Sequence, residues 1–114
     1  MYANGVLSSM RFVETSIFTI EAKGLLPDDE YRALQVALML RPEQGVVIPG
    51  SGGLRKLRWA GRGHGKRGGI RVIYYWHVED EVLFMLLAYA KNTPEDLTAS
   101  QVKVLRQLVR EEMQ

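Results

Sequence analysis

Three strand-like runs in the second half of the sequence constrain the fold more than any other feature. Residues 54–60 and 70–78 alternate in polarity, and residues 82–91 are apolar on both faces. A glycine-rich loop over residues 61–69 and a turn at residues 79–81 join them. Runs so close in sequence pair as an antiparallel meander. The last run, apolar on both faces, takes a central position.

Helical periodicity flanks this meander on both sides. Ser16 is predicted to cap the short helix and Gly24 to close it, and the last helix is predicted to open on a capping box formed by Thr98 and Gln101. The sequence predicts an α+β domain, with the N-terminal helices and the C-terminal helix packed on one face of a twisted, mainly antiparallel β-sheet and the other face open. The helices are predicted over residues 16–23, 27–40 and 98–112, and two further short strands over residues 11–15 and 45–50.

The length of 114 residues suits a single domain. Residues 1–10 carry no clear pattern and are interpreted as a disordered leader, so that residues 11–114 form the domain. No apolar run approaches the about 20 residues of a membrane-spanning helix, and no membrane association is expected. The chain has no cysteine, which excludes disulfides, thiol catalysis and cysteine-ligated metals and favours a cytoplasmic location.

The positive charge is concentrated in the hairpin made by the first two runs. Residues 44–78 contain seven Lys or Arg and no Asp or Glu, whereas the rest of the chain has eight basic and thirteen acidic residues. Such a segregated patch favours an anionic partner, most often phosphate groups. The alternative is a solvated basic loop that binds nothing in particular.

Strand periodicity predicts which of these cations share a surface. Lys56 with Arg58, and Tyr89 with Lys91, have the same parity within their strands, and together with Arg71 they can converge on one concave face. Several cations around one phosphate stabilise a phosphoryl-transfer transition state, and RNA supplies its own nucleophile, the 2′-hydroxyl. We therefore assign catalysis to Lys56, Arg58, Arg71, Tyr89 and Lys91, and RNA binding to Arg55, Arg62, Lys66 and Arg67.

The sequence does not identify the general acid and the general base of this reaction, because the patch contains no Asp or Glu. Lys56, Lys91, Tyr89 or groups of a partner would have to move the protons. His64 and His77 are interpreted as surface residues, and the aromatic residues 74–76 as packing residues. The glycine-rich loop is not a nucleotide-binding motif, since it leads into a strand and not a helix. No cofactor or metal is predicted.

Several phrases of the sequence resemble one toxin family. They are F-V-E-T-S-I-F (12–18), D-D-E-Y-R-A-L-Q (28–35), V-I-P-G-S-G-G-L-R-K-L-R (47–58), G-K-R-G-G-I-R-V-I-Y-Y (65–75), L-L-A-Y-A-K-N (86–92) and D-L-T (96–98). As a set they resemble the HigB-type branch of the RelE toxin superfamily, over about residues 11–112. The resemblance implies a RelE-like fold and a ribosome-dependent mRNA endonuclease, a toxin of a type II toxin–antitoxin system that cuts message in the ribosomal A site.

The resemblance also implies partners and residue roles. A cognate helix-turn-helix antitoxin of HigA type would hold the toxin inactive and alone contact operator DNA. By local pattern the family's basic residues fall on Lys56, Arg58, Arg71 and Lys91, and Tyr89 stands in for a tyrosine that some relatives carry near the C-terminus. Two alternatives are a non-catalytic, ParE-like inhibitor of DNA gyrase and a plain RNA-binding module on the same scaffold.

Overall fold

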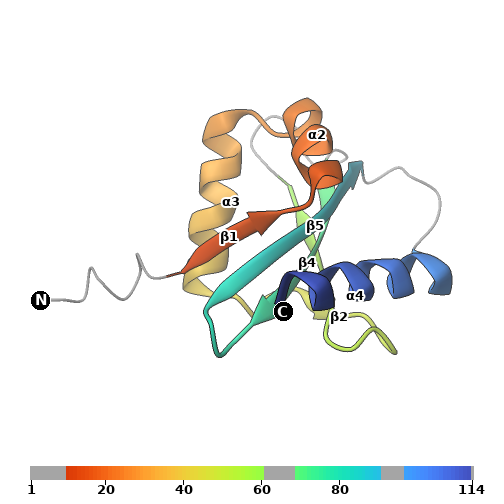
Figure 1. Ribbon diagram of the computed structural model, residues 1–114. Coiled ribbons are helices and arrows are strands. Elements are labelled where there is room, and N and C mark those ends of the chain that lie inside the picture. Colours follow the sequence, from red (N-terminus) through yellow and green to blue (C-terminus); the bar gives the residue numbers. More distant parts are fainter. Residues whose placement is uncertain (1–9, 61–68, 91–96, 114) are drawn as a thin grey trace, which may run out of the picture.

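The computed structural model describes residues 10–60, 69–90 and 97–113. The expected leader lies almost wholly outside these ranges. The elements follow the predicted order (Figure 1): β1 (Arg11–Glu14), α2 (Ser16–Leu25), α3 (Asp28–Leu40), β2 (Val46–Val47), β3 (Arg55–Trp59), β4 (Ile70–His77), β5 (Val82–Ala90) and α4 (Ala99–Met113).

The strands form one five-stranded sheet in the order β1-β5-β4-β3-β2. Strands β2 to β5 pair antiparallel, as the meander predicted, whereas β1 runs parallel to β5. The apolar strand β5 therefore lies inside the sheet, and both of its faces are apolar because each packs into an apolar cluster.

The N-terminal cap predicted for α4 is confirmed, whereas the cap predicted for α2 is not. The capping box of α4 is formed, because Gln101 N–H donates to Thr98 Oγ1 at 3.1 Å and Thr98 N–H donates to Gln101 Oε1 at 2.8 Å. For α2 the predicted cap was wrong by one residue. Thr15, not Ser16, accepts the hydrogen bond from Phe18 N–H, and the helix continues past Gly24 to Leu25.

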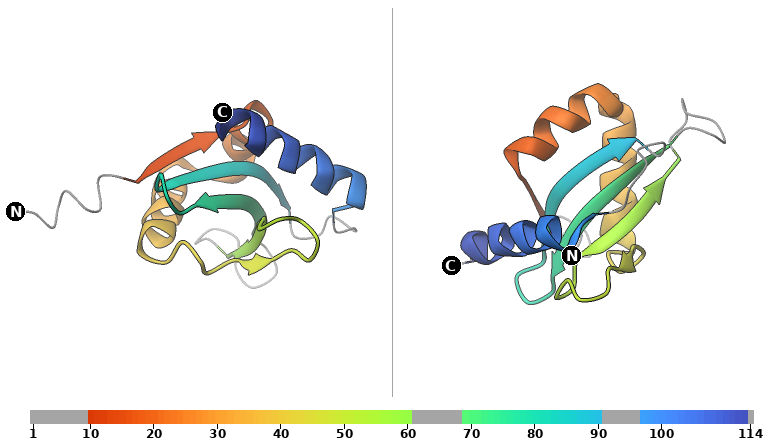
Figure 2. Two further views of the ribbon diagram at one scale, coloured as in Figure 1. Left: turned by 60° about the horizontal axis from the view of Figure 1, so that its bottom comes forward. Right: turned by 90° about the vertical axis from the view of Figure 1, so that its right-hand side faces the viewer.

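The predicted α+β class with a mainly antiparallel sheet is confirmed. Only the placement of α4 differs, because the helices lie on both faces of the sheet and not on one. One apolar cluster joins α2 and α3 to Val72 and Tyr74 of β4, whereas a second joins α4 to Ile73 and, at its edge, Tyr75. Alternate residues of a strand point to opposite faces, so α4 covers the face that α2 and α3 leave free. Figure 2 shows the sheet between α4 and the α2–α3 pair.

Strand β5 contains a β-bulge. Ile73 pairs with Leu87 and Tyr74 with Met85, so Leu86 is an extra residue in β5. Beyond the bulge the alternation reverses, and Ala88 packs with α2 and α3 while Tyr89 packs on the side of α4. Simple alternation therefore does not hold along the whole of β5.

Two side chains from the N-terminal cap and the body of α2 stabilise the bulge. The Thr15 hydroxyl donates to Leu86 C=O at 2.8 Å, and Glu21 Oε1 accepts from Ala88 N–H at 3.2 Å. The polar backbone groups released by the bulge are thus paired in the interior.

Among the described helices, none is long and apolar enough to cross a membrane.

Candidate functional site

A row of polar side chains crosses the sheet on the face that carries α4. Arg58 of β3 is the Cα partner of Arg71 in β4, and Arg71 is the partner of Tyr89 in β5. Residues directly opposite in antiparallel strands project to the same side, with Cα atoms about 4.5–5.5 Å apart. We call Arg58, Arg71 and Tyr89 the sheet row.

The sheet row places two positive charges side by side. Two arginines directly opposite one another repel, which destabilises a sheet unless an anion lies between them. Within the described residues, no salt bridge joins either arginine to a carboxylate. In addition, Arg71 Nη1 is buried and has no hydrogen-bond partner among the described residues. A buried guanidinium N–H of this kind is suited to an incoming acceptor, such as a phosphate oxygen.

A second row of paired residues, Lys56, Ile73 and Leu87, lies next to the sheet row on the same face. Lys56 of β3 is the partner of Ile73, and Ile73 is the partner of Leu87. Lys56 is half-buried and projects to the same face as Arg58, two residues along the strand. The parity argument therefore holds for Lys56, Arg58, Arg71 and Tyr89, which the structure brings onto one face.

Arg55 is separated from this group, although the sequence analysis placed it among the RNA-binding residues. It belongs with Leu57 and Trp59 to the side of α2 and α3. Its Nη1 donates to the carbonyls of Glu43 and Gly45, each at 2.8 Å. Arg55 therefore fixes the segment before β2. The other predicted residues, Arg62, Lys66, Arg67 and Lys91, lie outside the described ranges.

Helix α4 borders the sheet row, where the sequence analysis expected an open face. Leu97 and Val102, at the start of this helix, pack against the same apolar cluster as Leu87 and Tyr89. Further along, the guanidinium of Arg106 lies over the ring of Tyr75, 5.3 Å from its centroid. The site is thus a sheet face with a helix along one side.

Sequence reasoning missed the basic residues of α4. Lys103, Arg106 and Arg110 are spaced three and four residues apart, which places them on one side of a helix. This spacing can be seen in the sequence, but the helix was assigned to the wrong face of the sheet.

Groups of three or more metal-ligating side chains are absent from the described residues.

Two comparisons with known proteins found similar chains. The crystal structure of an archaeal RelE–RelB complex from Pyrococcus horikoshii OT3 contains a similar chain, with 22% identity and a TM-score of 0.49. The match covers 75% of this chain and 98% of that chain. A family model described as the RelE toxin of the RelE/RelB toxin–antitoxin system matches residues 11–114. Since that model spans nearly the whole sequence, the chain belongs to the RelE toxin family of toxin–antitoxin systems.

Proposed function

We propose that this chain is a ribosome-dependent mRNA endonuclease of the HigB type. The observation that carries the proposal is the sheet row, two opposed arginines and a tyrosine on one face of three adjacent strands. Family membership supports a toxin, and the arrangement of charge supports a phosphodiester as its target. The proposal places the toxin in the cytoplasm, with translated message as the substrate.

In the proposed reaction the RNA provides the nucleophile. The 2′-oxygen attacks the adjacent phosphorus as its proton leaves, and the bond from phosphorus to the 5′-oxygen breaks as that oxygen gains a proton. The products are a 2′,3′-cyclic phosphate and a 5′-hydroxyl. Arg58 and Arg71 would stabilise the charge that builds on the phosphate oxygens, and Tyr89 would orient the base or ribose.

The remaining residues take supporting roles in this proposal. Lys56 would contact the same phosphate or carry a proton, as would Lys91. Arg62, Lys66 and Arg67 would bind ribosomal RNA or message. A cognate helix-turn-helix antitoxin of HigA type would block the site and would itself contact the operator DNA. No metal ion takes part in the proposed step.

The test is induction of the chain in a bacterium, with new 5′ ends mapped on messages in the presence and absence of a translation inhibitor. We expect cuts within translated codons that disappear when translation is blocked. DNA breaks without message cleavage would contradict the proposal and favour a gyrase inhibitor. RNA binding without growth arrest would favour a plain RNA-binding module.

Substitution of Arg71 gives the sharpest single prediction. Arg71→Ala should lower cleavage by about 100-fold or more, because it removes a donor to the developing charge. Stability should be unchanged or slightly higher, since the repulsion from Arg58 is removed. The matched control is Arg32→Ala, an exposed arginine on α3. Equal toxicity of Arg71→Ala and the control would refute the assigned role.

A further inference from the structure

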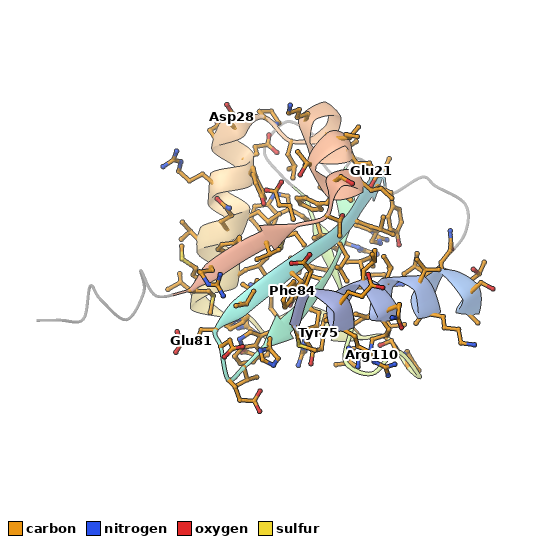
Figure 3. The ribbon with its side chains drawn as sticks, viewed as in Figure 1. Glu21, Asp28, Tyr75, Glu81, Phe84 and Arg110 are labelled. Atoms are coloured by element: carbon orange, nitrogen blue, oxygen red, sulfur yellow. The ribbon has the colours of Figure 1, made fainter. Side chains whose placement is uncertain are left out.

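A second concentration of positive charge lies between α4 and the loop before β3. A hollow of about 600 Å³ opens there, lined by Gly50, Ser51 and Gly52 of the loop and by one side of α4. The side chains from the helix include Lys103, Arg106 and Arg110. We call this hollow the α4 pocket. Figure 3 labels Arg110 beside the loop and Tyr75 below α4.

Within residues 10–60, 69–90 and 97–113, the cations of the α4 pocket have no acidic partners. Among the described residues, no salt bridge involves Lys103, Arg106 or Arg110, and Arg106 Nη1 is buried without a hydrogen-bond partner. The acidic residues of α4, Glu111 and Glu112, line a different hollow next to β1. The helix therefore separates its charges, with the positive side facing the loop.

The loop is shaped to receive Arg106. Gly52 has a φ of +74°, and a Cβ at this position would lie 2.6 Å from Arg106 Nε. The positive φ favours a glycine here, and a side chain at this position would also have to displace the guanidinium. The N–H groups of Gly50 and Gly52 form no hydrogen bond within the described residues. The hollow is therefore lined by guanidinium and ammonium donors beside a glycine-containing loop, and such donors suit a phosphate group.

The α4 pocket and the sheet row share one face of the sheet. Arg106 lies over Tyr75, which is four residues from Arg71 on β4 and has the same parity. At about 3.3 Å per residue the two Cα atoms are about 13 Å apart. A short single strand of RNA can reach both positions.

We propose that the α4 pocket binds a backbone phosphate of the RNA, a few nucleotides from the linkage held by the sheet row. This inference rests on the proposed function in taking RNA as the ligand. The pocket contributes to binding and not to bond breaking, so its loss affects the affinity for RNA and its salt dependence.

The experiment measures binding of a fluorescent single-stranded RNA with 2′-O-methyl riboses, which lacks the nucleophile. Anisotropy titrations from about 50 to about 200 mM salt give the affinity and the salt slope. The test variant is Lys103→Gln/Arg110→Gln, in which both residues are exposed and their loss leaves the core intact. We expect about tenfold weaker binding and a slope smaller by about 0.7, the loss of one phosphate contact.

The matched control removes the same charges from the other side of the sheet. Lys23→Gln/Arg32→Gln replaces one exposed lysine on α2 and one exposed arginine on α3, and it should leave the slope unchanged. Equal losses in both variants, or wild-type binding by the test variant, overturn the proposal. So does a wild-type chain that fails to bind the RNA.

A second variant removes no charge. Gly52→Ala should displace Arg106 and weaken RNA binding, because the new Cβ would lie only 2.6 Å from its Nε. Unchanged binding would contradict the assigned role of Arg106. Two further results would reassign the pocket: pyrophosphate or a nucleotide binding there while RNA does not, or a pocket variant that binds RNA normally and loses the antitoxin.

These results are separable from the test of the proposed function. If the wild type cleaves message but Lys103→Gln/Arg110→Gln has an unchanged salt slope, the role of the α4 pocket is refuted and the nuclease assignment stands. If the slope of this variant is reduced but the wild type does not cleave message, the pocket stands as an RNA-binding site and the nuclease assignment is refuted.

Discussion

Tyr74 and Tyr75 are adjacent in β4 and illustrate how strand parity divides two like residues between different roles. The Tyr74 side chain is fully buried, and its hydroxyl donates to Pro42 C=O at 2.6 Å and accepts from Gly45 N–H at 2.9 Å. The Tyr75 ring lies on the opposite face, beneath Arg106. The first residue holds the segment that leads into β2, and the second supports the α4 pocket.

Removing the Tyr74 hydroxyl should therefore destabilise the fold. Tyr74→Phe leaves a buried N–H and a carbonyl without their partner, at a cost of about 1–3 kcal/mol. Tyr75→Phe is the control, because the Tyr75 hydroxyl makes no hydrogen bond within the described residues, and its cost should be under about 0.5 kcal/mol. Urea unfolding measures both. Equal losses would show that Tyr74 contributes through its ring alone.

Tyr31 and Tyr74 make the stability of the folded protein depend on pH in the alkaline range. Burial, reinforced by a hydrogen bond to Glu14, raises the pKa of Tyr31 far above its usual value, and burial also raises the pKa of Tyr74. The folded protein then binds these protons more tightly than the unfolded chain. Their contribution to stability is complete below about pH 10 and declines as the pH rises further.

The corresponding measurement is urea unfolding at several pH values above neutrality. Each tyrosine lowers the unfolding free energy by at most about 1.4 kcal/mol per pH unit above about pH 10. Tyr31→Phe should flatten this decline relative to the wild type. An identical slope in the variant would mean that Tyr31 titrates alike in both states.

At the scale of elements, the bulge in β5 determines which residues join the sheet row. Without Leu86 as an extra residue, Tyr89 would project toward α2 and α3, and the row would end at Arg71. The bulge depends on Thr15, which caps α2 and also donates to Leu86 C=O. A residue far away in the sequence thus positions Tyr89.

Thr15→Val preserves the shape of the side chain and tests this dependence. It should cost about 1–3 kcal/mol through loss of the cap and of a part-buried hydrogen bond. RNA cleavage per folded molecule should fall as well, since Tyr89 moves with the bulge. Ser16→Ala is the control, at an exposed position whose hydroxyl makes no hydrogen bond within the described residues. A larger loss at Ser16 would restore it as the helix cap.

Periodicity and cap signals explain what was predictable at this scale. The faces of β3 and β4 and the capping box of α4 follow from local patterns, so Lys56, Arg58 and Arg71 were placed on a common face from the sequence. The bulge has no local signature, because it depends on contacts from Thr15 and Glu21 more than 60 residues away. The position of α4 was missed for a related reason, since one apolar stripe fits either face of a sheet.

At the scale of the whole molecule, the sheet is shared by two apolar cores. Leu34 of α3 lies in the first cluster and Leu105 of α4 in the second, and both are buried. Strands β4 and β5 contribute side chains to each. Since the same strands form one wall of both cores, the two layers should unfold together.

Two truncations test this coupling. Leu34→Ala and Leu105→Ala should each cost about 2–5 kcal/mol. Both tryptophans, Trp59 and Trp76, pack against the first cluster, so their fluorescence reports that layer, whereas circular dichroism reports all the helices. The two signals should coincide in each variant. Loss of helical signal before the fluorescence change in Leu105→Ala would show that α4 detaches independently.

The edges of the sheet carry a consequence for self-association. The described edge strands pair over four residues in β1 and two in β2, and Val46 in β2 is 72% exposed. An edge this short offers few backbone groups as a template for another copy, so an exposed valine there is tolerated without ordered stacking into fibrils. The long strands β4 and β5, whose apolar sequences would aggregate most readily if left unpaired, are enclosed on both sides.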